Sequence, residues 1–257
     1  MSTALYDRVI FGPIHSRRLG LSLGVNLLPL NHKLCSFDCI YCECGWGEKR
    51  EKVRFNDRET VRKELEQRLT EMVEAGTPPD VITFAGNGEP TLHPDFGEII
   101  EDTIALRDRI APRAKVSVLS NATQIGRERV RAALLRVDNN ILKLDSAFDP
   151  TVRLVDRPRG NYSVAETVEN MKKFEGQLIV QTMFLRGEFE GKIVDNTTEE
   201  EVSAWLALIR EIAPRQVMVY TIDRSTPAEN LQKVTVEELK AIAARVEALG
   251  ITCSVAG

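Results

Sequence analysis

Three closely spaced cysteines are the residues of this sequence best suited to chemistry. They read Cys35-x-x-x-Cys39-x-x-Cys42, within the segment KLCSFDCIYCECG at residues 33–45. Three thiolates on one loop can hold three irons of a [4Fe–4S] cluster and leave the fourth iron open. An open iron can bind and activate a small molecule, whereas a fully ligated cluster passes electrons. The spacing therefore indicates an enzyme rather than an electron carrier.

Zinc and a disulfide are the alternatives that the spacing leaves open. Cys44 supplies a possible fourth thiolate for zinc. Structural zinc sites usually join two separated ligand pairs, but these four cysteines lie within ten residues and the distant Cys253 is single. The spacing favours iron–sulfur over zinc, and zinc over a disulfide. We expect Cys44 to be a packed small residue rather than a ligand, and Cys253 to lie in a strand.

A glycine-rich turn is the second motif, with Gly86, Asn87, Gly88, Glu89 and Pro90 in succession. Glycines let the backbone approach a ligand closely, and a carboxylate beside them can accept a hydrogen bond from an ammonium group. By itself the segment is typical of an ordinary turn. It lacks the pattern of a dinucleotide-binding loop and the Lys-Ser/Thr of a phosphate-binding loop.

Short apolar runs alternate with longer amphipathic ones along the chain. This alternation predicts a parallel β-sheet with helices outside it, either doubly wound or curled into a full or partial barrel. The expected strands are 23–28, 81–85, 115–120, 141–145, 178–184, 216–222 and 251–255. The expected helices are 58–74 (with Asp57 as N-cap and Gly76 as stop), 96–109, 125–137, 164–174, 199–212 and 236–249.

The chemically interesting residues follow predicted strands. In parallel α/β folds the active groups lie beyond the carboxyl ends of the strands. The cysteine segment and the glycine-rich turn occupy such places. So do other polar positions further along the chain, namely Ser120, Asn121, Asp145 and 221–224.

The bulk composition bounds the class of protein. The chain has 257 residues, 43% of them hydrophobic, which is enough for a packed α/β core. A net charge of −4 does not indicate a nucleic-acid surface. No apolar run has the length of a membrane span, and the first residues lack the pattern of a signal peptide. With clustered thiols, these features predict a cytoplasmic protein without membrane contact.

Together the two motifs resemble those of the radical S-adenosylmethionine (radical SAM) superfamily. The resemblance runs from about residue 11 to about residue 220. Residues 11–28, with KLCSFDCIYCECG and GNGEPTLHP, are most similar to the group related to the tRNA wyosine-synthesis enzyme. The resemblance implies a partial (β/α)6 TIM-like barrel with the cluster loop after its first strand. It implies one core domain over 1–257, with an N-terminal extension (1–22), a barrel core (23–222), and a C-terminal helix and short strand (223–257).

The resemblance also implies roles for individual residues. Cys35, Cys39 and Cys42 would ligate a [4Fe–4S] cluster whose open iron binds S-adenosylmethionine (SAM). Tyr41 would pack near the adenine, and Glu89, with the backbone of Gly86, Asn87, Gly88 and Pro90, would bind the methionine amino group. Candidates for the carboxylate and ribose of SAM are Ser120, Asn121, Lys143 and Asp145. Candidates for the adenine or substrate wall are Gln181, Met183, Tyr220 and Thr221.

The implied reaction is the reductive cleavage of SAM to a 5′-deoxyadenosyl radical that abstracts hydrogen from an unidentified substrate. An electron donor such as flavodoxin or ferredoxin would supply the electron. The substrate can be a small molecule, a peptide or a protein. A tRNA substrate is not favoured, because the chain has no cysteine before Cys35 for a second cluster and no basic surplus.

Two other functions remain open. A glycyl-radical-enzyme activase shares the cysteine spacing, but it usually has Asp-x-Lys where this chain has Lys143-x-Asp145. A non-catalytic iron–sulfur redox protein would use the same cysteines. Arg17 and Arg18 could hold an anionic substrate or the cluster loop. Asp223 and Arg224 are candidate substrate contacts or a salt-bridged loop.

Overall fold

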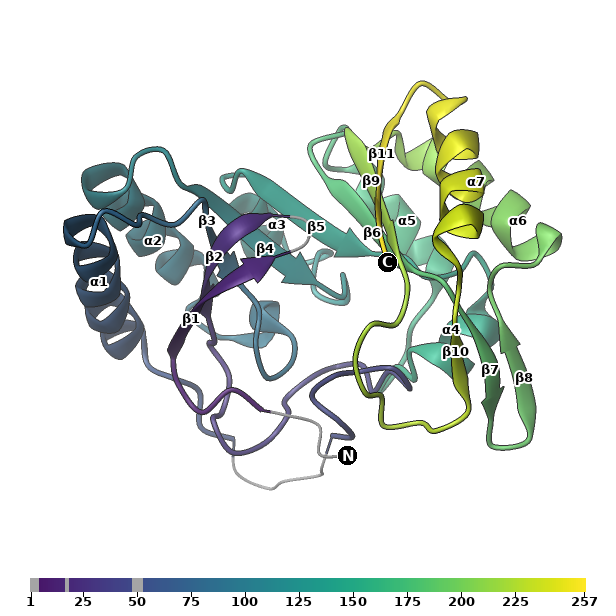
Figure 1. The fold of residues 1–257 in the computed structure, drawn as a ribbon, viewed down its shortest axis with the longest axis horizontal. Helices are drawn as coiled ribbons and strands as arrows, with labels where there is room; N and C mark the ends of the chain where they lie inside the picture. The colour runs from purple at the N-terminus through teal and green to yellow at the C-terminus, as the bar shows by residue number, and fades with distance from the viewer. Residues whose placement is uncertain (1–4, 17–18, 48–52) are drawn as a thin grey trace.

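The computed structural model describes residues 5–16, 19–47 and 53–257, and it contains a curled parallel sheet with helices on its outer face (Figure 1). The sheet has eight strands in the order β1-β2-β3-β4-β5-β6-β9-β11. β1 pairs antiparallel with β2, and the other neighbours are parallel. The strands are β1 (Ile10–Ser16), β2 (Gly20–Val25), β3 (Val81–Phe84), β4 (Lys115–Ser120), β5 (Asn139–Lys143), β6 (Ile179–Met183), β9 (Gln216–Tyr220) and β11 (Thr252–Ala256).

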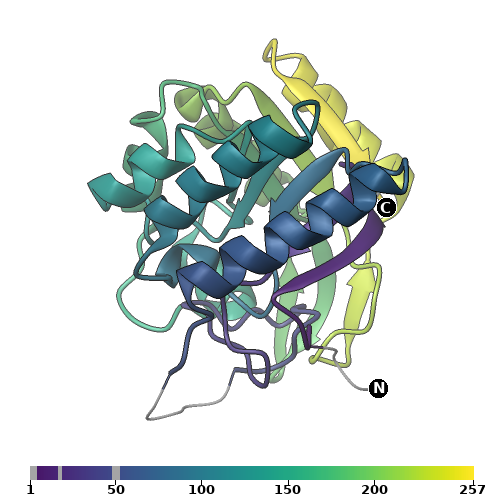
Figure 2. The same ribbon diagram turned by 90° about the vertical axis from the view of Figure 1, so that its left-hand side faces the viewer.

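The helices follow the strands, and most of them cover the convex side of the sheet, where Figure 2 shows several lying side by side. They are α1 (Arg58–Glu74), α2 (Phe96–Ile110), α3 (Glu128–Leu134), α4 (Asp149–Val155), α5 (Val164–Lys172), α6 (Glu199–Ile212) and α7 (Val236–Glu247). A short 3₁₀ turn, η1, spans Pro90–Leu92. This is the partial barrel that the resemblance implied.

Local sequence explains where the main helices begin and end. The side chain of Asp57 accepts a hydrogen bond from the Thr60 amide and caps α1, and Gly76 follows that helix with a φ of +73°. Thr235 and Glu238 form a capping box at the start of α7. None of the helices in the described part of the chain is long and apolar enough to cross a membrane.

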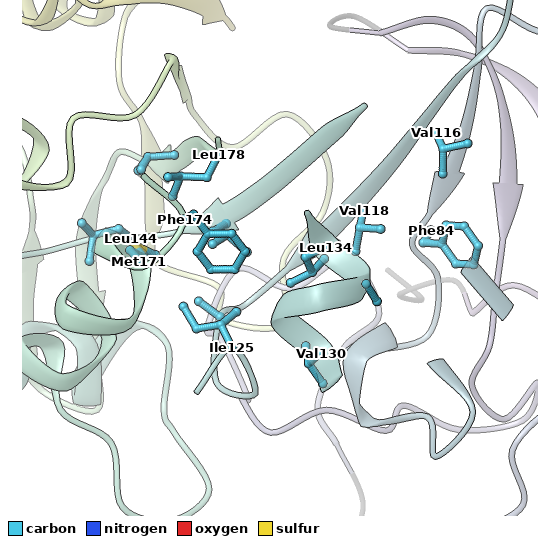
Figure 3. Packing of buried hydrophobic residues seen from close by; sticks show 14 of the residues in the cluster. Phe84, Val116, Val118, Ile125, Val130, Leu134, Leu144, Met171, Phe174 and Leu178 are labelled. Carbon is cyan, nitrogen blue, oxygen red and sulfur yellow. The ribbon is translucent and has the colours of Figure 1, made fainter. Parts of the chain in front are cut away.

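The main core lies between the sheet and its helices. Figure 3 shows strand residues such as Phe84 and Val118 facing the same layer as Val130 and Leu134 of α3 and Phe174 after α5. All five of these side chains are buried. Burial of apolar area on this face holds the strands at fixed positions, so their carboxyl ends form a defined edge.

Strand register decides which side chains meet inside the barrel. Lys143 of β5 pairs with Gln181 of β6, and Gln181 pairs with Met218 of β9. Residues paired across neighbouring strands point to the same side of a sheet. Lys143 and Gln181 therefore share one row at the inner, carboxyl end of the strands.

Several sequence-based boundaries were wrong. The first parallel strand is 20–25 rather than 23–28, because the side chain of Asn26 accepts a bond from the Leu28 amide and turns the chain. The strand expected at 141–145 is 139–143. The helix expected at 125–137 is 128–134, because a turn containing Gly126 precedes it.

Three features of the fold were not expected from the sequence. One is β1, an edge strand that contains the dipeptide Gly12-Pro13, which is uncommon within strands. The second is α4, a helix of seven residues. The third is a separate antiparallel sheet in the order β10-β7-β8, formed by β7 (Leu185–Phe189), β8 (Lys192–Asp195) and β10 (Leu231–Lys233).

Candidate active site

The cysteine loop lies across the carboxyl end of the sheet and is tied to neighbouring segments by backbone hydrogen bonds. The amide of Leu34 donates to the Asn87 carbonyl at 2.8 Å, and the amide of Glu89 donates to the Leu34 carbonyl at 3.0 Å. On the other side, the amide of Ile40 donates to the Val155 carbonyl at 2.9 Å. The loop is therefore held between the glycine-rich turn and the end of α4.

Lys33 links the beginning of the cysteine segment to its middle and its end. Its buried ammonium group donates to the carbonyl of Gly45 at 2.9 Å and to Asp38 at 3.1 Å. Burial alone lowers the pKa of Lys33, but the neighbouring thiols and Asp38 outweigh it and raise the pKa. The ends of the cysteine segment are thus joined by a fixed positive charge.

The three thiols of the motif have separate partners. Cys35 Sγ accepts hydrogen bonds from Asn121 Nδ2 and the Phe37 amide, both at 3.4 Å. Cys39 Sγ lies 3.7 Å from Lys143 Nζ. Burial raises the pKa of the Cys35 thiol to about 12, whereas the polar side chain of the neighbouring Cys44 lowers the pKa of the Cys42 thiol to about 5.

These thiols fit the donor set of an iron–sulfur cluster. All three come from one loop, and polar hydrogens from Asn121 and Lys143 already point at the sulfurs of Cys35 and Cys39, as they do at cluster thiolates. Within residues 5–16, 19–47 and 53–257, no three His, Cys, Asp or Glu side chains converge closely enough to hold one metal ion as they stand.

Glu89 is a buried carboxylate beside this loop, with 2% of its surface exposed. Its Oε1 accepts bonds from Ser120 Oγ at 2.8 Å and from the amide and hydroxyl of Thr91. Among the described residues, its Oε2 accepts one bond, from the Asn121 amide at 2.6 Å. Burial raises the pKa of Glu89 despite these donors. Because a carboxylate oxygen has two lone pairs, Oε2 retains room for a further donor.

The glycine-rich turn needs its glycines for steric reasons. Gly86 and Gly88 have φ values of +127° and +139°. A Cβ on Gly88 would lie 1.8 Å from the carbonyl oxygen of Leu34. Gly88 therefore allows the turn to pair with the residue that precedes Cys35, and Pro90 then begins η1.

Asn87 has a different use from the rest of the turn. Its side chain donates to the carbonyls of Tyr6 and Pro29, at 2.8 and 2.9 Å, and accepts from the Tyr6 amide. It fastens the N-terminal segment to the turn. The structure thus brings Glu89 and the backbone of the turn to the thiols, but directs the Asn87 side chain elsewhere.

Lys143 and Asp145 form a buried polar group with Tyr41. Lys143 Nζ lies 3.2 Å from Asp145 Oδ2, contacts the Tyr41 hydroxyl and sits over the Tyr41 ring, 4.5 Å from its centroid. The other oxygen of Asp145 accepts the Met183 amide at 2.9 Å. The order Lys-x-Asp therefore places both groups at the site.

Gln181, Met183 and Tyr220 line the adjoining strands. Gln181 Nε2 donates to the Tyr220 hydroxyl at 2.8 Å, and both residues are half-buried. Met183 is buried in an apolar cluster with Phe37 and Tyr41 of the cysteine loop. Thr221 has a structural contact, because its hydroxyl accepts a hydrogen bond from the Val234 amide at 2.9 Å.

The smaller sequence features have structural partners. Cys44 Sγ donates to the Gly86 carbonyl at 3.3 Å, and Cys253 is half-buried in β11. Arg224 forms a salt bridge with Glu43 of the cysteine segment at 2.7 Å, and Asp223 forms one with Lys233 of β10 at 3.7 Å. Arg17 and Arg18 lie outside the described residues.

One residue of the site was missed from the sequence. Asp156 follows α4, is 1% exposed, and lies 3.2 Å from both Cys39 Sγ and Lys143 Nζ. No local pattern marks it, because it reaches the cysteine loop through a helix that was itself unexpected. The sequence gives a weak signal for it, an acidic residue two positions before a proline (Asp156-Arg157-Pro158).

The fold and the site can be compared with known proteins. The model of the radical SAM superfamily matches residues 32–197. A UPF0026 protein of Methanocaldococcus jannaschii is 31% identical over 242 residues, which cover 92% of this chain and 70% of that protein. A protein named GTPase Obg from Brachyspira hyodysenteriae is 29% identical over 240 residues, but the chain spans 33% of its length.

Solved structures share the fold at low identity. A radical SAM methyltransferase from Sphaerobacter thermophilus superposes with a TM-score of 0.68 at 14% identity, covering 91% of this chain and 65% of that one. TYW1 with a lysine–pyruvate adduct gives a TM-score of 0.62 at 14% identity, covering 88% and 73%. From its cysteine loop, half-barrel and matched residues, the chain belongs to the radical SAM superfamily of enzymes, in one family with the UPF0026 proteins.

Proposed function

We propose that this chain binds a [4Fe–4S] cluster at Cys35, Cys39 and Cys42 and cleaves SAM reductively. The observation that carries the proposal is the link between Glu89 and the cysteine loop. The Glu89 amide bonds to Leu34, next to Cys35, and its carboxylate bonds to Asn121, whose side chain donates to Cys35. Leu34 and Asn121 thus each connect Glu89, which can accept a hydrogen bond from an ammonium group, to Cys35 of the cysteine loop.

Each residue near the loop has a distinct task under this proposal. Oε2 of Glu89 accepts a hydrogen bond from the methionine ammonium group of SAM. The backbone of Gly86–Pro90 would line the same end of the ligand, and Ser120 and Asn121 keep the Glu89 carboxylate oriented. Lys143 supplies a positive charge suited to the methionine carboxylate.

The adenosine end of SAM would lie toward Tyr41 and the strands beyond it. Tyr41 presents a ring, and the pair of Gln181 and Tyr220 presents polar groups to an adenine or a substrate. Buried apolar side chains around the loop, including Phe37 and Met183, keep water from the reacting atoms. When bound, the cluster and SAM would supply a 5′-deoxyadenosyl radical that abstracts a hydrogen atom from the substrate.

The partners follow from the same chemistry. Reduction of the cluster requires a low-potential electron donor, for which we propose a flavodoxin or a ferredoxin. A small molecule or peptide suits the substrate better than tRNA, because the chain carries a net charge of −4. The five free cysteines favour a reducing compartment, so we propose a cytoplasmic location.

The proposal is tested with protein whose cluster is assembled anaerobically. Incubation with SAM and dithionite should yield 5′-deoxyadenosine, and omission of dithionite should prevent it. A screen of deuterated candidate substrates then identifies the hydrogen donor, because the label passes into 5′-deoxyadenosine. A protein that holds its cluster and leaves SAM intact under dithionite would contradict the proposed reaction.

A further inference from the structure

Asp156 connects α4 to the cysteine loop through both its backbone and its side chain. Its carbonyl accepts the Asp38 amide at 2.9 Å, and its own amide donates to Val152 at 2.8 Å. Its Oδ1 accepts hydrogen bonds from the Cys39 thiol at 3.2 Å, the Tyr41 hydroxyl at 3.3 Å and Lys143 Nζ at 3.2 Å. Burial raises the pKa of Asp156 to about 7, although Lys143 and the hydrogen bonds to Oδ1 oppose that rise, so the carboxylate is ionised at alkaline pH.

The charges around Cys39 are unevenly balanced. Lys143 contributes one positive charge, and the buried carboxylates of Asp145 and Asp156 contribute two negative charges. A cysteine that ligates iron is a thiolate and has no proton to donate. Lys143 Nζ, 3.7 Å from the sulfur, then remains a hydrogen-bond donor to Cys39, while Asp156 adds negative charge beside it.

We propose that the carboxylate of Asp156 and the ammonium group of Lys143 act on Cys39 with opposite charges, and that the two together set the reduction potential of the cluster. The inference rests on the proposed cluster site and adds a residue that neither motif contains. Asp145 also holds Lys143, so loss of Asp156 leaves the ammonium group at the site with one carboxylate partner.

The sign of each effect follows from electrostatics. Reduction adds one electron to the cluster and makes or breaks no bond, so nearby negative charge opposes it and nearby positive charge favours it. Asp156→Asn should therefore move the midpoint to a more positive potential. Lys143→Met should move it to a more negative potential. Each shift should change the ratio of reduced to oxidised cluster at least about tenfold at a fixed potential, which is about 59 mV for one electron.

The test is an anaerobic redox titration of the reconstituted full chain at about pH 9, where the Asp156 carboxylate is ionised, followed by the electron paramagnetic resonance signal of the reduced cluster. Dithionite supplies the electrons, and iron per chain is measured in every sample. Asp138→Asn is the matched control, because Asp138 is a half-buried carboxylate paired with Arg107, apart from the cysteine loop. Its midpoint should equal that of the unaltered protein.

Opposite shifts for Asp156→Asn and Lys143→Met support the inference. Midpoint potentials equal to that of the control would overturn the inference but would not contradict the proposed cluster site. If Asp156→Asn takes up no iron, Lys143→Met decides, since a negative shift supports the inference and an unchanged midpoint overturns it. Failure of the unaltered chain to assemble a cluster would instead overturn the proposed function, so the two failures are distinguishable.

Discussion

The carboxylate of Glu89 accepts a hydrogen bond from the backbone amide of Asn121 at 2.6 Å, although 32 residues separate them. The side chain of the same Asn121 donates to Cys35 Sγ at 3.4 Å. One residue at the end of β4 therefore orients the acid of the glycine-rich turn and contacts a thiol of the cysteine loop. This geometry joins the two motifs into one site.

Glu89→Gln should weaken SAM binding while leaving the cluster in place. The substitution keeps the shape of the side chain but removes the charge that would hold the methionine ammonium group. A charge-assisted hydrogen bond contributes about 1.5–3 kcal/mol, so the dissociation constant should rise about 10- to 150-fold. Equilibrium dialysis with labelled SAM against the reconstituted protein measures this change.

Glu98→Gln is the control for that experiment, because Glu98 is an exposed acid in the first turn of the following helix, α2. It should bind SAM as the unaltered protein does. Equal affinities for Glu89→Gln and Glu98→Gln would assign Glu89 a structural role and remove it from the SAM site.

Gly88→Ala should destabilise the cysteine loop. The added Cβ would lie 1.8 Å from the Leu34 carbonyl oxygen, and the φ of +139° is unfavourable for alanine. We expect a loss of at least about 2 kcal/mol in the free energy of unfolding and a fall in iron per chain. Urea unfolding and iron analysis measure the two effects.

Gly97→Ala offers a matched comparison within α2. The nearest atom to its added Cβ is Ala133 Cβ at 4.0 Å, so the methyl group has room. Alanine is favoured over glycine inside a helix by about 1 kcal/mol, and this variant should be as stable as the unaltered protein or more so. If both glycine variants behaved alike, the close approach at Gly88 would not be what positions the loop.

Cys44→Ser should retain the cluster. Cys44 Sγ donates to the Gly86 carbonyl at 3.3 Å, and a serine hydroxyl can make the same bond. We expect unchanged iron content and a change in stability below about 1 kcal/mol. Cys42→Ser is the comparison and should lose iron. A Cys44→Ser protein depleted of iron would show that Cys44 is a ligand, as the zinc alternative requires.

The elements with strong periodic patterns could be predicted from the sequence. The bounds of α1, α6 and β4 coincide with the expected ones, because each has clear caps or a continuous apolar run. The β10-β7-β8 sheet could not be found this way. Its strands have three to five residues, Gly187 has a φ of +139°, and β10 pairs with β7 across a long stretch of chain.

The residues of the site likewise fall into those that a local sequence motif indicates and those that only tertiary packing brings together. The three cysteines and Glu89 lie in motifs that have local spacing, so the sequence contains them. Asp156 reaches Cys39 from 117 residues away, through the packing of α4 on the loop. The sequence predicted a role for the backbone of Asn87, whereas the role of its side chain depends on tertiary hydrogen bonds to Tyr6 and Pro29 that no local spacing indicates.

Asp138 should contribute to the pH dependence of stability. Burial by itself raises its pKa, but the Val116 amide at 2.8 Å and the Arg107 guanidinium at 2.7 Å outweigh it and lower the pKa below the usual 3.8. A carboxyl whose pKa is lowered in the folded state stabilises it at neutral pH, and this contribution is lost as the pH falls through the lowered pKa.

Asp138→Asn removes that contribution. The variant should be less stable than the unaltered protein by about 1–2 kcal/mol at neutral pH, and the gap should narrow below about pH 4. Urea unfolding at several pH values measures both curves. A gap of constant size from neutral to acidic pH would mean that the Asp138 charge does not contribute.

The most direct test of the central claim is the iron, acid-labile sulfide and 5′-deoxyadenosine obtained from the anaerobically reconstituted chain and from its Cys35→Ala/Cys39→Ala/Cys42→Ala variant. The unaltered chain should hold about four irons and four sulfides and release 5′-deoxyadenosine from SAM under dithionite. The triple variant should hold no cluster and release none. Cluster assembly or SAM cleavage by the triple variant, or neither by the unaltered chain, would contradict the claim.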